Sequence, residues 1–273
     1  MALDSSKRST GPLAIVTGAS SGIGKALALR LGVDGYRVGL IARRRDELEA
    51  VAAAIAAAGG AAVPAVADVG DRAALRAAIA EIEGRLGRTD VMVANAGFGA
   101  PTQLDPLNTQ DVEQTIRVNL LGVIYSVEAV LPGMLARGRG QLLAISSLAA
   151  FKGLPGESAY CASKAAVNAY MEGLRIALRP RGVVVTTVCP GFVQTRMATM
   201  NSTMPFLMSA DAAARRIARL IARRLGGVRC FPMPMALLMS LIARLPDAVV
   251  ARLIRAEPDR EAGLETAAAK GVR

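Results

Sequence analysis

The sequence predicts an α/β fold: a single doubly wound parallel sheet with helices on both faces. Short apolar runs alternate with segments of helical periodicity from about residue 13 to about residue 189. The runs are continuously apolar, which is typical of parallel strands buried on both faces. The chain has 273 residues, of which 52% are hydrophobic, so it can bury a large core.

Each element follows from its apolar pattern and from the residues that end it. The expected strands are Leu13–Thr17, Arg37–Ala42, Ala61–Ala67, Asp90–Ala94, Gly140–Ser146 and Val183–Cys189. The expected helices are Lys25–Leu31, Asp46–Ala58, Arg72–Leu86, Val112–Ala136 and Ser158–Leu178. Strict alternation of this kind predicts a parallel sheet whose strands are joined by crossover helices.

The absence of histidine excludes several classes of active site. With no His, the chain cannot hold a Ser–His–Asp triad, a histidine general base or a His-ligated metal. Cys161, Cys189 and Cys230 show no close metal-ligand spacing, so no metal site is predicted. They are typical of reduced thiols in a cytoplasmic protein. The polar first ten residues and the short apolar run Leu13–Val16 do not resemble a signal peptide, so a cytoplasmic location is expected.

The net charge of +11 allows two interpretations. One is an anionic partner, such as nucleic acid, a membrane surface or a phosphorylated ligand. The other is a set of solvated arginine faces, which we favour because the arginines are spread along the chain. No nucleic-acid partner is therefore predicted.

Three glycines lie in the turn between the first expected strand and the first expected helix. They are Gly18, Gly22 and Gly24. The pyrophosphate of a dinucleotide needs backbone N–H donors, the positive end of a helix dipole and close approach of the main chain, which glycine allows. Their placement indicates a Rossmann-like, dinucleotide-binding sheet rather than a plain structural turn.

Several motifs resemble those of short-chain dehydrogenases/reductases and occur in that family's order, from about Leu13 to about Met197. Thr17–Gly24 resembles the cofactor motif, Asp68-Val69 the pair that holds the adenine, and Asn95-Ala96-Gly97 the motif after the fourth strand. No linker-like stretch interrupts the chain, so one domain is expected over residues 12–255, with polar tails at residues 1–11 and 256–273. The resemblance implies that this domain binds a dinucleotide and carries catalysis. It implies cofactor contacts from Gly18, Ser20, Ser21, Gly22, Ile23, Gly24, Asp68, Val69, Asn95, Ala96 and Gly97.

The end of the second expected strand predicts the choice of nicotinamide cofactor. An acidic residue there would bind the ribose hydroxyls of NAD. Here Ala42 is followed by Arg43 and Arg44, which can grip a 2′-phosphate. We therefore expect NADP(H), with Arg43 as the main ligand and Arg44 as helper, although both could be solvated residues at a helix start. Ser21 departs from NADP-preferring relatives, in which this position is often basic.

Tyr160 and Lys164 share one face of an expected helix, one turn apart. A free phenol has a pKa of about 10, and a nearby ammonium is expected to lower it. The phenol could then exchange a proton with a carbonyl or alcohol oxygen. The resemblance implies that Lys164, with Tyr160, also holds the cofactor at the nicotinamide ribose.

Two further residues complete the expected reaction centre. Ser147 lies thirteen residues before Tyr160, the family's separation for the serine that binds the substrate carbonyl, and is favoured over its neighbour Ser146. Asn119 matches the family asparagine of a water-mediated proton relay, or else merely kinks its helix. The nicotinamide segment that the resemblance implies contains Pro190, Gly191, Val193 and Thr195. Cys161, beside Tyr160, is interpreted as a small buried hydrophobe rather than a redox group.

The C-terminal third, about residues 196–255, is expected to hold the substrate loop and an apolar segment. Its apolar residues could form an adaptable substrate wall or simply core: Met197, Met200, Met204, Phe206, Leu207 and Met208. The uncharged stretch Cys230–Ala243 contains two prolines and is too short to span a membrane. We favour pocket cover or subunit contact over membrane-surface association.

These features predict an oxidoreductase that transfers hydride between NADP(H) and a small-molecule carbonyl or alcohol, with a hydrophobic ketone or acyl-type substrate. The alternative is a catalytically silent NADP-binding regulator or scaffold. A scaffold would have no need of Asn119, Ser147, Tyr160 and Lys164 together. The resemblance also implies a homodimer or homotetramer.

Overall fold

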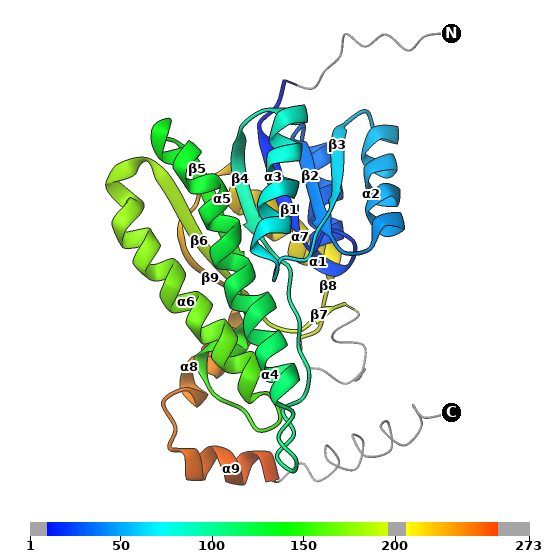
Figure 1. The fold of residues 1–273 in the computed structure, drawn as a ribbon. Helices are drawn as coiled ribbons and strands as arrows, with labels where there is room; N and C mark the ends of the chain where they lie inside the picture. Colours follow the sequence, from blue (N-terminus) through cyan, green and yellow to red (C-terminus); the bar gives the residue numbers. More distant parts are fainter. Residues whose placement is uncertain (1–9, 196–205, 256–273) are drawn as a thin grey trace, which may run out of the picture.

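The computed structural model describes residues 10–195 and 206–255, and within them it shows a seven-stranded parallel sheet (Figure 1). The strand order is β3-β2-β1-β4-β5-β6-β9. The strands are β1 (Leu13–Thr17), β2 (Arg37–Ala42), β3 (Ala61–Val66), β4 (Thr89–Ala94), β5 (Gly140–Ile145), β6 (Val183–Pro190) and β9 (Gly227–Phe231). The order reverses direction between β1 and β4, which is where doubly wound sheets bind their ligands. The predicted fold class is confirmed.

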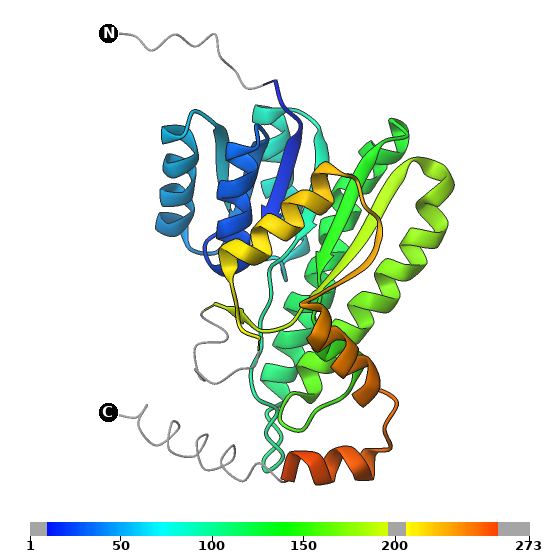
Figure 2. The same ribbon diagram turned by 180° about the vertical axis from the view of Figure 1, so that it is seen from behind.

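Helices cover both faces of the sheet (Figures 1 and 2). One face carries α3 (Arg72–Leu86), α5 (Gly122–Ala136) and α6 (Ser158–Leu178). The other carries α1 (Gly22–Val33), α2 (Arg45–Ala57) and α7 (Ala210–Ala222). Short 3-10 turns follow β5 and α6, at η2 (Leu148–Phe151) and η3 (Arg179–Arg181).

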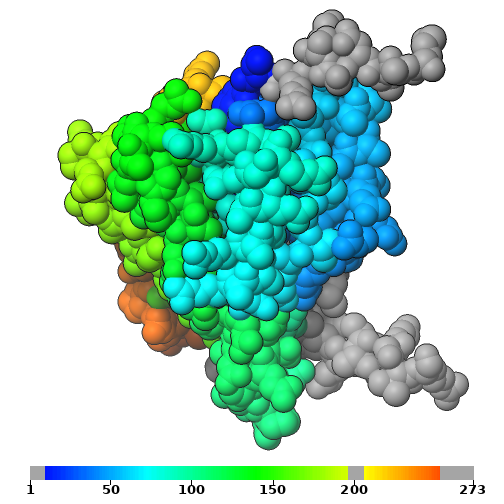
Figure 3. Space-filling view, turned by 45° about the horizontal axis from the view of Figure 1, so that its top comes forward, coloured from blue at the N-terminus to red at the C-terminus, as the bar shows by residue number. Residues whose placement is uncertain are grey.

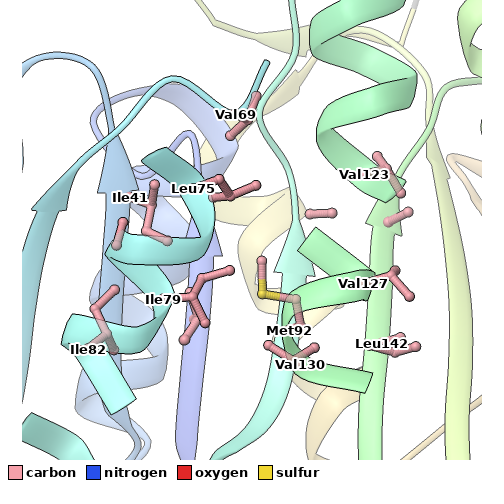
Figure 4. Close-up of a cluster of buried hydrophobic side chains, with 14 of the residues drawn as sticks. Ile41, Val69, Leu75, Ile79, Ile82, Met92, Val123, Val127, Val130 and Leu142 are labelled. Atoms are coloured by element: carbon pink, nitrogen blue, oxygen red, sulfur yellow. The ribbon is translucent and has the colours of Figure 1, made fainter. Parts of the chain in front are cut away.

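Each face buries its own apolar cluster against the sheet. Figure 4 shows the cluster beneath α3 and α5, where Leu75, Ile79 and Val127 meet Met92 and Leu142 of the strands. Burial of one such side chain stabilises the fold by about 1.5–3 kcal/mol. The core is built almost without aromatic side chains, as the composition of 3% aromatics requires.

The expected helix Val112–Ala136 proves to have three parts. They are α4 (Thr109–Ile116), a π-helical turn η1 (Arg117–Leu121) and α5. The whole run is long and apolar enough to cross a membrane by length and composition. In this fold it packs against the sheet instead, and the π-helical turn carries Asn119.

Strand β9 was not expected from the sequence. It begins with glycine and carries Arg229, so its apolar pattern is weak. Its backbone pairing with β6 at the sheet edge nevertheless makes it a strand.

The carboxyl ends of the strands meet at one end of the molecule, the lower end in Figure 1. There lie α8 (Met233–Ile242), α9 (Asp247–Arg255) and the small β7 (Val193–Gln194) and β8 (Met208–Ser209) pair. The segment around residues 100–115 projects from the same end in the space-filling view (Figure 3). The expected tails, apart from residues 10 and 11, lie outside the described residues, as do Met197, Met200 and Met204.

Candidate active site

The glycine-rich turn is shaped for an anion. Gly18 and Gly22 adopt positive φ angles of 66° and 54°, which glycine alone takes up without strain. Helix α1 begins after Ser21 with no side-chain cap, and its first turn has no acidic residue. Backbone N–H groups at the positive end of the helix dipole are thus left to a bound phosphate. A dinucleotide pyrophosphate fits this cradle, and the Thr195 side chain packs directly against Gly22.

Thr17 ties the glycine-rich turn to the end of β4. Its Oγ1 accepts hydrogen bonds from the backbone N–H groups of Asn95 and Ala96, at 3.0 and 3.1 Å. The Asn95 side-chain amide donates back to the Thr17 carbonyl oxygen over 2.9 Å. Thr17 was not singled out as a site residue from the sequence, although it opens the glycine motif. It fixes the separation of the two strand ends that flank the crevice.

The two arginines after β2 have different partners. Arg44 donates from Nη2 to Ser20 Oγ and Ser21 Oγ, at 3.0 and 3.1 Å, and so lies over the glycine-rich turn. Arg43 is mostly exposed and pairs with the Asp68 carboxylate at 3.7 Å. The structure thus brings Arg43, Arg44, Asp68 and the turn serines to one edge of the crevice.

Ser147, Tyr160 and Lys164 converge at the end of β5. The Ser147 hydroxyl hydrogen-bonds the Tyr160 phenol. Lys164 is buried, and its Nζ lies 5.7 Å from the centroid of the Tyr160 ring. The same Nζ donates a hydrogen bond to the main-chain oxygen of Ile145 over 2.9 Å.

The ionisation of Tyr160 differs from the expectation drawn from the sequence. Burial raises the pKa of the Tyr160 phenol to about 12, although the hydrogen bond with Ser147 acts to lower it. Lys164 does not reverse this effect, because its ammonium is directed to Ile145 and its own pKa falls to about 8 through burial. The phenol therefore keeps its proton at neutral pH.

The two adjacent serines occupy different environments. Ser146 is buried, and its Oγ donates to the main-chain oxygen of Lys164 over 3.2 Å. Ser147 Oγ accepts from the Ala149 N–H over 3.1 Å and faces Tyr160. The geometry favours Ser147 over Ser146 for contact with a substrate carbonyl.

Asn119 is fully buried in the π-helical turn, and its amide group is engaged at both atoms. Its Oδ1 accepts from the Phe98 N–H over 2.8 Å, while its Nδ2 donates to the Phe98 oxygen and to Ser163 Oγ, both over 2.9 Å. Ser163 Oγ in turn donates to the main-chain oxygen of Tyr160 over 2.7 Å. The side chain of Asn119 thus holds the turn after β4 against α6, and Ser163 is a member of this network that sequence reasoning missed.

An apolar cover lies over the end of β6. Its buried cluster comprises Leu148, Cys189, Met235, Ala236 and Met239, with Phe151 and Phe192 packed against it. The Gly191 N–H donates to the Phe231 oxygen over 2.7 Å, and a Cβ added at Gly191 would lie 3.0 Å from the Met235 sulfur. Helix α8 therefore covers the side of the site next to Ser147.

Comparison with known proteins decides the family. The model of the short chain dehydrogenase family matches residues 12–205. This chain belongs to the short-chain dehydrogenase family. It is 41% identical over 235 residues to an uncharacterized oxidoreductase of Myxococcus xanthus, covering 86% of this chain and 92% of the relative.

Two solved structures share both the fold and part of the sequence. A 3-ketoacyl-ACP reductase from Sinorhizobium meliloti superposes with a TM-score of 0.75 at 32% identity, over 83% of this chain and 100% of the other. An actinorhodin polyketide ketoreductase variant, solved with NADPH, gives a TM-score of 0.75 at 29% identity, over 81% and 95%. The chain is thus an oxidoreductase of the short-chain dehydrogenase kind, a family that acts on carbonyl and alcohol groups of small molecules.

A short-chain dehydrogenase with this arrangement can polarise a carbonyl oxygen from two sides. The Ser147 hydroxyl, at the start of η2, and the Tyr160 phenol, on α6, lie next to one another at the end of β5. In the described part of the chain, no cluster of three potential His, Cys, Asp or Glu metal ligands occurs. Cys161 is buried next to Tyr160, and burial raises the pKa of its thiol.

Proposed function

We propose that this short-chain dehydrogenase uses NADP(H) to interconvert a carbonyl compound and its alcohol, with a hydrophobic ketone or acyl-type substrate. The observation that carries the proposal is the Ser147–Tyr160 hydrogen bond, with Lys164 buried behind it. NADPH, when bound, supplies the hydride. Residues of this chain bind the substrate oxygen, orient the reacting groups and supply the proton.

Tyr160 is the proposed proton donor in the reducing direction. Its raised pKa keeps the phenol protonated at neutral pH, so a proton is available for a carbonyl oxygen that gains negative charge. Ser147 Oγ donates a second hydrogen bond to the same oxygen. Lys164 holds the nicotinamide ribose and places a positive charge beside the phenol, whereas Asn119 fixes the α6 helix that carries both groups.

The preference for NADP(H) rests on charge at the end of β2. No carboxylate stands at Ala42; the Arg44 guanidinium lies beside Ser20 and Ser21, and the Arg43 guanidinium lies beside Asp68. We assign Arg43 as the main ligand of the 2′-phosphate and Arg44 as a second ligand anchored at the turn. Arginine binds phosphate through charge-assisted, often bidentate hydrogen bonds. The related ketoreductase solved with NADPH supports this choice.

The preference for an apolar substrate rests on the cover. Leu148 follows Ser147 directly, and the buried methionines of α8 pack against it. Methionine side chains adapt their shape to an apolar ligand. The likeness to a 3-ketoacyl-ACP reductase supports an acyl-type compound as one form of this substrate.

The proposal is tested by following NADPH and NADH consumption with a panel of carbonyl compounds. We expect turnover with long-chain ketones or 3-ketoacyl thioesters, with NADPH preferred over NADH. Turnover of small polar carbonyls alone would contradict the apolar substrate class. A cytoplasmic location and a homodimer or homotetramer remain predictions, and polar tails are proposed for residues 1–11 and 256–273.

A further inference from the structure

Two cysteines far apart in the sequence face one another at the edge of the sheet. Cys189 of β6 and Cys230 of β9 are register partners in the parallel pairing of these strands. Partners in register project their side chains to the same face, and neighbouring strands lie about 4.8 Å apart. That spacing falls within the Cα separation of about 4.4–6.8 Å that a disulfide takes.

The two thiols already interact in the reduced protein. A hydrogen bond joins the Cys189 and Cys230 side chains, and both cysteines are free thiols. Because the two thiols already stand on the same face of paired strands, a bond between them requires no change in the register of either strand. Cys161 lies on α6, outside this pair.

The pair is asymmetric in a way that suits stepwise oxidation. Cys230 is half-buried on the edge strand, whereas Cys189 is fully buried, with its Sγ 3.7 Å from Asn168 Oδ1. The interaction between the thiols lowers the pKa of Cys230 and raises the pKa of Cys189. The Cys230 sulfur is therefore the better nucleophile, and the buried Cys189 sulfur is its neighbour on the adjacent strand.

We propose that Cys189 and Cys230 form a dithiol site that a hydroperoxide oxidises reversibly to an intramolecular disulfide. The Cys230 thiolate attacks the peroxide, so that an S–O bond forms, the O–O bond breaks and water leaves after protonation. The Cys189 sulfur then attacks the Cys230 sulfenic acid, an S–S bond forms and the S–O bond breaks with loss of a second water. In sum, two thiols and one hydrogen peroxide give one disulfide and two waters, and an external dithiol reverses the reaction.

The site adjoins the reaction centre without belonging to it. Cys189 lies near Lys164, and it is followed by Pro190-Gly191 of the proposed nicotinamide segment. Cys230 is followed by Phe231, which accepts the Gly191 hydrogen bond and leads into α8. A disulfide between the two cysteines would therefore join β6, which lies beneath the site, to β9, which leads into the covering helix α8. The thiol chemistry itself does not depend on the proposed substrate or cofactor.

The test treats the reduced, folded protein with hydrogen peroxide, alkylates the remaining thiols and measures intact mass and non-reduced peptides. We expect a monomer that has lost two hydrogen atoms, a cross-linked peptide pair containing Cys189 and Cys230, and full reversal by dithiothreitol. The Cys161→Ser variant should behave like the wild type. The Cys189→Ser variant should stop at a sulfenic acid on Cys230, trapped by dimedone, and Cys230→Ser should form no cross-link.

Wild-type protein alone also decides the question if a variant fails to fold. Peroxide treatment in denaturant should remove the selectivity among the three cysteines. The proposal is overturned if Cys189 and Cys230 both remain alkylatable while Cys161 is oxidised. It is equally overturned if the disulfide joins two chains, or if the loss of two hydrogens persists in Cys230→Ser.

Discussion

Lys164 Nζ donates its hydrogen bond to the main-chain oxygen of Ile145, over 2.9 Å, rather than to the phenol of Tyr160. The lysine is thereby anchored to the end of β5, and its position relative to the phenol is set by the sheet. Burial lowers the pKa of the amine to about 8, because a charged ammonium is poorly solvated there. This anchored amine has a measurable effect on stability.

The stability of the cofactor-free protein should rise with pH above about 8 through Lys164. The folded pKa of about 8 lies below the ordinary value of 10.5, so the unfolded chain binds more protons between these values. The free energy of unfolding should therefore increase by about 2–3 kcal/mol between pH of about 8 and about 10. Above that range Tyr160 opposes the trend, because its pKa is raised to about 12 and its contribution falls as pH rises from about 10.

Denaturant unfolding at a series of pH values measures this effect, with Lys164→Met as the control. The variant has no amine to titrate, so its unfolding free energy should lack the rise that Lys164 gives the wild type. Parallel pH profiles for the two proteins would show that Lys164 is not desolvated in the folded chain.

Replacing either arginine after β2 should weaken NADPH binding much more than NADH binding. A charge-assisted hydrogen bond to phosphate is worth about 1.5–3 kcal/mol, so Arg43→Asp or Arg44→Ala should raise the NADPH dissociation constant by about 10-fold to 100-fold. Arg45→Ala is the matched control, because Arg45 pairs with Glu49 along α2 and is mostly exposed. Fluorescence titration with both cofactors measures the effect, and equal losses for NADPH and NADH would defeat the assignment.

Gly24→Ala should damage both the turn and cofactor binding. An added Cβ would collide with the Gly18 carbonyl oxygen and would lie 2.5 Å from Asn95 Nδ2. Overpacking of this kind costs about 1–3 kcal/mol. Gly84→Ala is the control, because this exposed residue inside α3 has open space around its Cβ position, and it should gain up to about 1 kcal/mol. Thermal unfolding of the two variants should shift in opposite directions, and shifts of the same sign would contradict the packing described for the turn.

Asn119→Ala should lower both stability and turnover. The substitution leaves the N–H and the oxygen of Phe98 without their side-chain partner, at a cost of about 2–4 kcal/mol in all. Ser126→Ala, on the same helical run, removes a hydrogen bond to Gly122 within its own helix, and it should cost less and leave turnover intact. Unfolding and steady-state kinetics should be measured on both proteins. A stable Asn119→Ala variant with normal turnover would show that the network is dispensable.

The sequence predicted most of the sheet because its strands are continuously apolar and end in glycine or polar residues. It missed β9, since Arg229 and the neighbouring glycines hide a strand whose pairing is set by tertiary contact with β6. It also missed the π-helical turn around Asn119, because the apolar pattern runs through it without a break. Backbone hydrogen bonds between segments distant in the sequence produce no local pattern of residue types from which they could be predicted.

The candidate site was predictable where residue type and spacing alone carry the chemistry, as for Tyr160 and Lys164. The roles of Thr17 and Ser163 were not, because each acts through hydrogen bonds to backbone groups that only the fold brings near. The same holds for the phenol of Tyr160: spacing suggests a lowered pKa, but burial raises it. Desolvation depends on the whole environment of a group, which helical spacing does not report.

The most direct test of the central claim is the turnover of Tyr160→Phe with NADPH and its best carbonyl substrate. General acid catalysis contributes at least about 100-fold, so the rate constant should fall by that factor or more while NADPH still binds. Tyr170→Phe, on the same helix and packed against the core, is the matched control and should keep normal turnover. Full activity in Tyr160→Phe would contradict the role of this phenol as the proton donor.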